Sequence, residues 1–424
     1  MLSLLLALSH PAHAFCGTYV GQAGADLYNS ASQLVFVRQG TTTTLTLAND
    51  YAGSVTDFAL VIPVPQVLSA EDVTTVDSAL FAELDRYSGP RLVSYTCEDF
   101  APDTASDDSA SPQADEGEYS DSVTIEAEFS AGEYHFVVLS AEESDSLLTW
   151  LDDHGYAVST DAESLLQEYI DAGSYFLAAQ VQLEQIPPDS SFLSPIRIRY
   201  EDSTLSLPIR LGTLNAQGAQ DLVIYGINDA DDGELLISNY PQVTVEDECM
   251  LPESASADFG AAWLANVDAA FDGQAGWILE YAWAPYHCDP CPDGEALSDE
   301  VLNDLGYNGT GFDAMFTRLH VRYTPEQATE DLSLYASGVY DQTQVRYITY
   351  NHELESTFPI CGVGMVPADE AGDCVYGGNG GDSSDDTGEW HPVRKACGCA
   401  SGAASPWGLG ALLGLALTRR RSRR

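Results

Sequence analysis

Short segments in which apolar residues alternate with polar ones, or run together, occur along most of this chain. TTLTLAN at residues 43–49 alternates, whereas LVFVRQ at residues 34–39 is a continuous apolar run, and turn residues bound both. Such segments of four to eight residues are typical of β-strands with one or both faces buried. We predict strands at residues 34–39, 43–49, 57–65, 91–96, 122–129, 133–141, 175–185, 196–200, 205–211, 221–227, 277–282, 317–323 and 345–350.

A second pattern, with apolar residues three or four positions apart, predicts a smaller number of helices. The segments that show it are residues 78–87, 144–154, 162–172, 258–271 and 295–305. The predicted strands come in hairpin-like runs, and the helices are grouped between these runs. This order favours an α+β fold with mainly antiparallel sheets over a doubly wound fold. A division into two subdomains that meet near residues 249–252 remains an alternative.

Two acidic, low-complexity segments interrupt this pattern. Residues 99–122 have little to bury, and we expect a disordered insertion between strands there. Residues 377–389 read GGNGGDSSDDTGE, which is typical of a flexible linker. The predicted organisation is a signal peptide at 1–14, an α+β domain at 15–375, a linker at 376–396 and a C-terminal tail at 397–424.

The charge balance excludes one class of partner. The 424 residues include 16 basic and 66 acidic ones, which gives a formal net charge of -50. Five of the basic residues are arginines within the last six positions, so the rest of the chain is even more acidic. A surface of this kind repels phosphate backbones, and we therefore expect no nucleic-acid partner.

The N-terminus predicts export. Residues 2–8 form a short apolar segment, and Ala12-His13-Ala14 matches the small-x-small pattern of a signal cleavage site. Cleavage after Ala14 would leave Phe15 and Cys16 at the new N-terminus. The alternative is a buried N-terminal strand. Export places the cysteines in an oxidising compartment, where disulfides form.

The C-terminal tail, CGCASGAASPWGLGALLGLALTRRRSRR, predicts attachment to the envelope. Its apolar part spans 18 residues from Ala400 to Leu417, which as a helix reaches roughly 27 Å and barely crosses a bilayer. A permanent single-pass anchor with the arginines inside is one interpretation. The other is a resemblance to the MYXO-CTERM sorting tail, carried by Gly398-Cys399-Ala400, the apolar run and Arg419-Arg420-Arg421. That resemblance implies transient membrane retention, cleavage near Cys399 by a dedicated protease, and surface display through a lipid on Cys399.

The chain has nine cysteines, and seven of them lie in the predicted domain. Cys288 and Cys291 form a C-x-x-C pair, which serves as a zinc half-site, a redox dithiol or a local disulfide. Pro290 lies between them and a turn-like Pro-Asp-Gly follows, so a structural disulfide is favoured over a dithiol at a helix start. Other expected pairs are Cys361–Cys374 and Cys16–Cys97. Cys249 and Cys397 would then pair with each other or stay free.

No motif in the sequence assigns a catalytic residue, a metal ligand or a cofactor. NHELES at residues 351–356 lacks the second histidine of a zinc-protease helix, and NDADDGE at residues 228–234 lacks two calcium ligands. The weak site candidates are His287, His320, Arg210 and Arg318. Because Arg210 and Arg318 fall on predicted strands, we expect each to meet a carboxylate, and we favour a role in organising the core over a binding site.

Several short motifs, in order, give the predicted domain a family resemblance. They include Phe15-Cys16-Gly17, Ile62-Pro63-Val64-Pro65, Leu207-Pro208-Ile209-Arg210-Leu211-Gly212, Cys288-Asp289-Pro290-Cys291-Pro292 and Thr317-Arg318-Leu319-His320-Val321-Arg322-Tyr323. From residue 15 to about residue 374 the chain resembles the bacterial domain-of-unknown-function family 2330. The resemblance implies no activity and no functional residue.

The sequence favours an exported, non-enzymatic protein at the cell surface or outer envelope, anchored by its tail and binding an unidentified extracellular or structural partner. Its other expected contacts are the membrane, the export machinery and a tail-processing protease. The alternative is an exported enzyme, either a thiol oxidoreductase that uses Cys288 and Cys291 or a hydrolase with an unrecognised carboxylate site.

Overall fold

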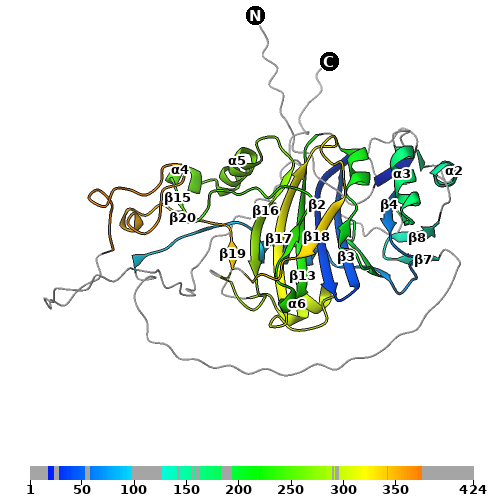
Figure 1. Cartoon of the computed structure of the whole chain (residues 1–424), viewed down its shortest axis with the longest axis horizontal. Helices are drawn as coiled ribbons and strands as arrows, with labels where there is room; N and C mark the ends of the chain where they lie inside the picture. The colour runs from blue at the N-terminus through cyan, green and yellow to red at the C-terminus, as the bar shows by residue number, and fades with distance from the viewer. Residues whose placement is uncertain are drawn as a thin grey trace, which may run out of the picture.

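Two stacked β-sheets with helices on their outer faces form the body of the protein (Figure 1). The computed structural model describes residues 18–22, 28–52, 58–97, 127–140, 144–153, 156–157, 162–182, 193–216, 218–288, 291, 296–340 and 342–374. The predicted signal peptide, acidic insertion, linker and tail lie outside these residues, as do Ala14, Cys16, Cys397 and Cys399.

The larger sheet has eight strands in the order β19-β16-β17-β13-β2-β3-β11-β5. All neighbours are antiparallel except β2 and β13, which pair in parallel at its centre. The bounds are β2 Tyr28–Gln39, β3 Thr42–Ala52, β5 Val73–Thr75, β11 Ile196–Glu201, β13 Gln220–Asp229, β16 Gly276–Trp283, β17 Ala314–Tyr323 and β19 Thr343–Gln344.

The second sheet has six antiparallel strands in the order β7-β8-β10-β4-β1-β9. Its strands are β1 Thr18–Gln22, β4 Phe58–Val64, β7 Glu128–Ala131, β8 Tyr134–Leu139, β9 Tyr156–Ala157 and β10 Tyr175–Val181. Two three-stranded sheets complete the β-structure. They are β12-β18-β14 (Ser206–Leu207, Leu332–Ala336, Leu235–Ile237) and β15-β20-β6 (Met250–Leu251, Arg346–Thr349, Arg91–Val93).

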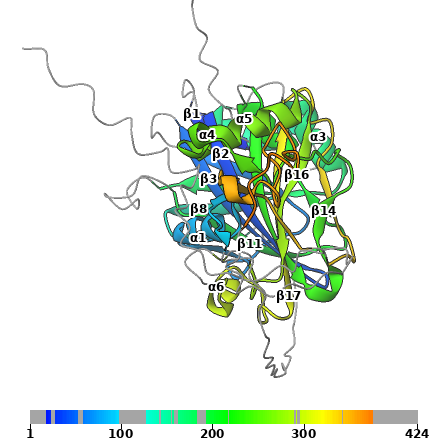
Figure 2. The ribbon, with the colours of Figure 1, turned by 90° about the vertical axis from the view of Figure 1, so that its left-hand side faces the viewer.

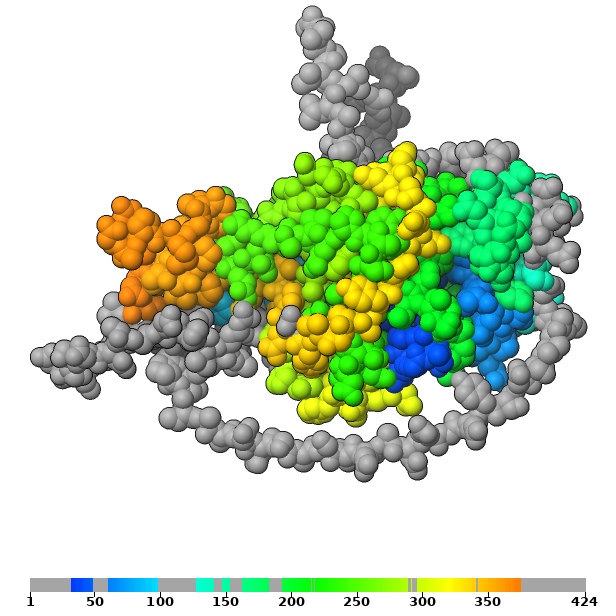
Figure 3. All heavy atoms as spheres, in the orientation of Figure 1, coloured from blue at the N-terminus to red at the C-terminus, as the bar shows by residue number. Residues whose placement is uncertain are grey.

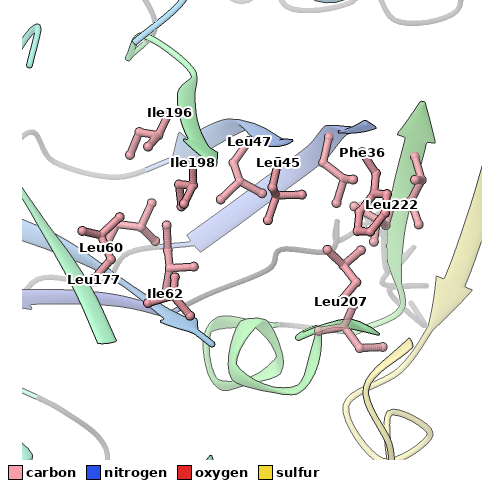
Figure 4. Close-up of a cluster of buried hydrophobic side chains, with 14 of the residues drawn as sticks. Phe36, Leu45, Leu47, Leu60, Ile62, Leu177, Ile196, Ile198, Leu207 and Leu222 are labelled. Atoms are coloured by element: carbon pink, nitrogen blue, oxygen red, sulfur yellow. The ribbon is translucent and has the colours of Figure 1, made fainter. Parts of the chain in front are cut away.

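The main core lies between the inner faces of the two large sheets. Alternate side chains of β2 and β3, such as Phe36, Leu45 and Leu47, meet Leu60 and Leu177 of the smaller sheet (Figure 4). The intervening residues point the other way, so that Val35 and Val37 belong to a separate cluster on the outer face. The period of two seen in the sequence therefore builds both faces of the larger sheet.

Helices cover the outer faces of both sheets, as the two views in Figures 1 and 2 show. On the smaller sheet, α2 (Ser144–Asp153) and α3 (Ala162–Asp171) pack over Val61, Phe176 and Ala178. On the larger sheet, α1 (Ala79–Ser88) and α6 (Asp299–Asp304) pack over β2, β13 and β16. Next to the short α4 (Glu253–Ser256), α5 (Phe259–Phe271) covers Ile278 of β16 and Tyr347 of β20. None of the helices in the described part combines the length and apolar character needed to cross a bilayer.

The predicted α+β class with mainly antiparallel sheets is confirmed, and the strongly patterned elements lie close to their predicted positions. The strand predicted at residues 205–211 is wrong in its second half. Only Ser206–Leu207 form a strand, and Arg210–Asn215 form the 3-10 helix η3, because the Asp331 carboxylate accepts the backbone N–H groups of Ile209 and Arg210 and turns the chain. Strands of two or three residues, such as β15 and β19, have no pattern long enough to predict.

Three disulfides join all six cysteines that the structure describes. Cys288–Cys291 is the local pair expected from the sequence. The expected Cys361–Cys374 and Cys16–Cys97 pairs are wrong, because Cys361 is bonded to Cys249 and Cys374 to Cys97. Cys249 is accordingly neither free nor bonded to Cys397.

Strand pairing explains the two long-range bonds. Met250 and Ile360 form a β-bridge, which brings the adjacent Cys249 and Cys361 together across 112 residues of sequence. Likewise β6 runs parallel to β20, so the segments that follow these two strands lie side by side and Cys97 reaches Cys374. Both bonds therefore fasten the C-terminal part of the described chain to earlier strands.

Removing the long-range bonds should destabilise the protein more than removing the local one. Bonds that span 277 and 112 residues restrict the unfolded chain far more than one that spans 3. We expect Cys97→Ala/Cys374→Ala and Cys249→Ala/Cys361→Ala each to lower the free energy of unfolding by about 2–5 kcal/mol. Cys288→Ala/Cys291→Ala is the control and should cost less. Urea titrations of the three variants would measure this, and equal losses would contradict it.

Candidate functional site

A row of charged side chains lies on the outer face of the eight-stranded sheet. Along β17, Arg318, His320 and Arg322 alternate with Leu319 and Val321, which face the main core. Two of these outward positions are nevertheless buried, because α1 and α5 cover this face: Arg318 and His320 are each only 1% exposed, and Arg322 is partly buried. Three cationic side chains in a covered strand require partners of the opposite charge.

The neighbouring strands supply two of these partners. Asp221 of β13 lies opposite Arg322 in the sheet register. Glu280 comes from β16, where the register against β17 shifts between Leu279 and Tyr281. This irregularity places two successive side chains, Glu280 and Tyr281, on the same outer face, as a β-bulge does.

The groups form one chain of short ion pairs. His320 Nε2 lies 2.7 Å from Asp221 Oδ1, and His320 Nδ1 lies 2.9 Å from Glu280 Oε1. Arg318 Nε donates to Glu280 Oε2 at 2.5 Å, and Arg318 Nη1 lies 2.8 Å from Asp85 Oδ1 of α1. At the other end, Arg322 bridges Asp221 and Asp268, the latter from α5, at 2.6 Å each. We call these seven residues the buried charge network.

Aromatic rings line this network. The Arg318 guanidinium lies over the Tyr225 ring at 5.3 Å, and the Arg322 guanidinium lies over the Phe271 ring at 5.1 Å. Phe271 also meets the His320 ring edge-on at a centroid distance of 5.9 Å. The rings exclude water and contribute cation–π attraction, which is worth more in such a dry environment.

The geometry fixes the protonation states. Both ring nitrogens of His320 face carboxylates, so both must donate and the ring is an imidazolium. Burial opposes this charge, but the hydrogen bonds to Asp221 and Glu280 outweigh it and raise the pKa of His320 to about 9. Burial likewise opposes the ionised carboxylates, yet His320 with Arg322 or Arg318 holds the pKa of Asp221 and of Glu280 below the ordinary value.

A second polar group links this face to the C-x-x-C pair. The Tyr281 hydroxyl donates to the Tyr87 hydroxyl at 2.8 Å, and Tyr87 donates to the backbone oxygen of His287 at 2.8 Å. Arg91 donates to the backbone oxygen of Tyr87, and burial lowers the pKa of Arg91 to about 10. These bonds fix the chain just before Cys288.

The network has the chemistry of a structural element. Its charges are satisfied by one another, and its histidine has no open ring nitrogen with which to exchange a proton with a substrate. Among the described residues, no group of three or more histidine, cysteine, aspartate or glutamate side chains is arranged to hold a metal ion. The network joins α1 and α5 to the sheet.

The structure separates the four weak site candidates. Arg318 and His320 share Glu280 within the network. Arg210 lies on η3 rather than on a strand and pairs with Glu168 of α3 at 2.6 Å, far along the chain from the others. Both arginines thus meet carboxylates, as expected. His287 is exposed, and its ring is tilted by 49° against that of the adjacent Tyr286, at a centroid distance of 4.4 Å.

The C-x-x-C pair is closed. Cys288 and Cys291 are bonded, Cys288 is 5% exposed, and it packs in the cluster with Tyr281 and Trp283. Cys288 follows strand β16 after the turn at residues 285–286, whereas a reactive dithiol usually opens a helix. This position is that of a structural bond.

Exposed aromatic side chains gather near this bond, at the end of the larger sheet where β16 ends and β17 begins. Tyr286 and Phe312 stack with their centroids 4.2 Å apart, and Tyr340 shares a side-chain hydrogen bond with Tyr286. Phe312 is 68% exposed and Tyr340 45%. Exposed apolar side chains that lie together make this end of the sheet a candidate interaction site. We call Tyr286, His287, Phe312, Val339 and Tyr340 the aromatic surface.

Two backbone contacts hold the loop that carries Val339 and Tyr340. The Gly338 N–H donates to the Asp232 backbone oxygen at 2.9 Å, and the Glu234 N–H donates to the Val339 oxygen at 3.1 Å. Gly233 lies against this loop with φ of +72°, and a side chain there would meet the Val339 backbone. The aromatic surface is therefore built on fixed loops.

Sequence reasoning missed Asp85, Asp221, Asp268 and Glu280 as partners. One signal was available: TRLHVRY places three basic side chains at alternate positions of a single strand, which puts them on one face. The lone acid of GWILEYAW, Glu280, is a similar signal. The helical partners, Asp85 and Asp268, had none, because each resembles any exposed acid on an amphipathic helix.

Comparison with known proteins gives one match. Residues 10–335 match the family described as "Uncharacterized protein conserved in bacteria (DUF2330)", which confirms the predicted family resemblance over this range, although we expected it to reach about residue 374. No curated protein and no solved structure matches the chain.

The protonated His320 predicts a loss of stability at alkaline pH. Because its pKa is raised from 6.5 to about 9 on folding, its contribution is complete below pH 6.5 and is lost as the pH rises through about 9. We expect the free energy of unfolding to fall by roughly 3 kcal/mol across this range. Urea titrations at several pH values would measure it.

His320→Gln should abolish most of this pH dependence. His135→Gln is the matched control, since His135 meets one exposed carboxylate, that of Glu128 at 3.2 Å, and the Ser130 hydroxyl at 3.4 Å, and it should leave the profile unchanged. An unaltered slope in His320→Gln would show that another group titrates.

Breaking the network at Arg318 should cost far more than breaking a surface pair. Arg318→Met removes the cation that Asp85 and Glu280 share and leaves Glu280 with His320 alone, and we expect a loss of about 3–5 kcal/mol. Arg210→Met removes the pair with the exposed Glu168 and should cost less than about 1 kcal/mol. Thermal and urea unfolding would compare them, and a small loss in Arg318→Met would contradict the assignment.

Proposed function

This chain belongs to the bacterial DUF2330 family, and on that premise we propose that it is an exported, non-enzymatic binding protein held at the cell envelope by its C-terminal tail. The body would present the aromatic surface to a partner outside the cell. The tail at residues 397–424, which lies outside the described residues, would supply attachment.

The observation that carries this proposal is the set of disulfides. All six described cysteines are paired, and two of the bonds connect parts of the chain that are 112 and 277 residues apart. Cytosolic thiols are kept reduced, so a fold that is fastened in this way suits an oxidising compartment. The predicted cleavage site at Ala14 supports the same conclusion.

The burial and pairing of the charged groups in the network support a non-enzymatic role. An enzyme needs a titratable group that reaches its substrate, and His320 and Arg318 are buried and paired on all sides. The Cys288–Cys291 bond, with Cys288 buried, argues against the alternative of a thiol oxidoreductase. The exposed rings of Phe312 and Tyr340 are instead typical of a protein that recognises a partner.

The attachment can be tested at Cys399. In the host cell, Cys399→Ala should leave protein that begins at Phe15 and keeps its whole tail in the inner membrane, because the tail could be neither cut nor displayed. The wild-type protein should instead be found in the outer envelope with a new N-terminus at Phe15 and a shorter C-terminus. Fractionation and intact mass would measure both.

Cys397→Ala, which removes the neighbouring cysteine, is the matched control and should behave as wild type. Protein of unchanged mass and position in Cys399→Ala would refute the sorting tail. Wild-type protein found in the cytosol with both ends intact and all thiols reduced would refute the whole proposal.

A further inference from the structure

We propose that the aromatic surface binds a basic segment of a partner protein, with an arginine or lysine side chain placed over the rings of Phe312 and Tyr340. This inference rests on the proposed binding role and names its chemistry. Three loops form the surface, namely residues 284–288 after β16, residues 308–313 before β17, and residues 337–340 after β18.

The rings are arranged to offer their faces. Phe312 stacks on Tyr286 with an angle of 24° between the planes, so one face of the pair is covered and the other is open. Phe312 is 68% exposed, and the neighbouring Val339 and Tyr340 are 46% and 45% exposed. Because the loops are tied by backbone hydrogen bonds and a disulfide, little conformational freedom is lost when a partner binds.

The charge around the surface selects a cation. None of the three loops contains lysine or arginine. Exposed acids surround the rings: Asp313 follows Phe312, Asp299 begins α6 and accepts the Gly311 N–H at 2.7 Å, and Asp232 lies beside Gly338. The whole chain has a single lysine and a formal net charge of -50. A basic partner would therefore be drawn to this end by the protein's field.

Charge alone would attract cations to many acidic places on this molecule. The aromatic rings are the feature that should make a cation prefer this surface. A guanidinium or ammonium group over an aromatic face gains cation–π attraction, while nearby carboxylates accept its hydrogen bonds. An exposed aliphatic site lacks this attraction. Val363 and Met365 form such a site, and they lie on the segment near residue 360 (orange), which projects away from the α6 end of the molecule (Figures 1 and 3).

The test measures binding of a fluorescent peptide of ten arginines to the purified, disulfide-bonded protein in about 0.15 M salt, with a glycine–serine peptide of equal length as the neutral probe. Phe312→Ala/Tyr340→Ala removes two rings and no charge, and should weaken arginine-peptide binding about tenfold. Val363→Ala/Met365→Ala changes two uncharged side chains that are at least as exposed, at 78% and 54%, and should bind as wild type.

Phe312→Leu separates cation recognition from apolar contact. It keeps most of the apolar side chain and loses the ring, so it should lose as much affinity as Phe312→Ala. Affinity that is unchanged in the ring variants, or fully kept in Phe312→Leu, would overturn the inference, as would equal binding of the neutral peptide. Because these measurements use purified protein, they are independent of the fractionation that tests export and anchoring.

Discussion

The interaction on which the fold depends is the pairing of β17 cations with carboxylates beneath two helices. Arg318, His320 and Arg322 project from one strand into a face that is covered rather than open to water. Removing such charges from water costs several kcal/mol per group unless partners and hydrogen bonds are in place. Glu280 and Asp221 serve two cations each, so the position of each strand and helix on this face is tied to the others. Because each of these carboxylates serves two cations, a shift of one element would break more than one ion pair.

The buried charge network and the aromatic surface occupy different parts of the same sheet. The titratable groups that most resemble a catalytic set are enclosed between the sheet and its helices. The aromatic surface lies at the end of the same sheet, where the loops after β16 and before β17 meet. The hydroxyls of Tyr281 and Tyr87 and the backbone of His287 join the two regions, so the covered face also supports the aromatic surface.

The family match ends before the disulfide-bonded part of the chain does. The match ends at residue 335, whereas the folded chain continues to residue 374 through β19, β20 and a final irregular segment. β20 pairs in parallel with β6 and β15, and both long-range disulfides lie next to these strands. Covalent bonds thus reinforce a segment whose small sheet has three strands of two to four residues each.

The sequence by itself determined the strands and helices with long, regular patterns, the α+β class, and the local Cys288–Cys291 bond. These features depend on neighbours in the chain, through the alternation of side chains or the closure of a short loop. Tertiary structure alone decided that Cys97 meets Cys374 and that Asp85 and Asp268 neutralise arginines on a distant strand. Such contacts depend on which surfaces pack together. The sequence around an acid or a cysteine does not indicate which distant residue it will meet. The aromatic surface is of the same kind, because Tyr286, Phe312 and Tyr340 meet only when three loops converge.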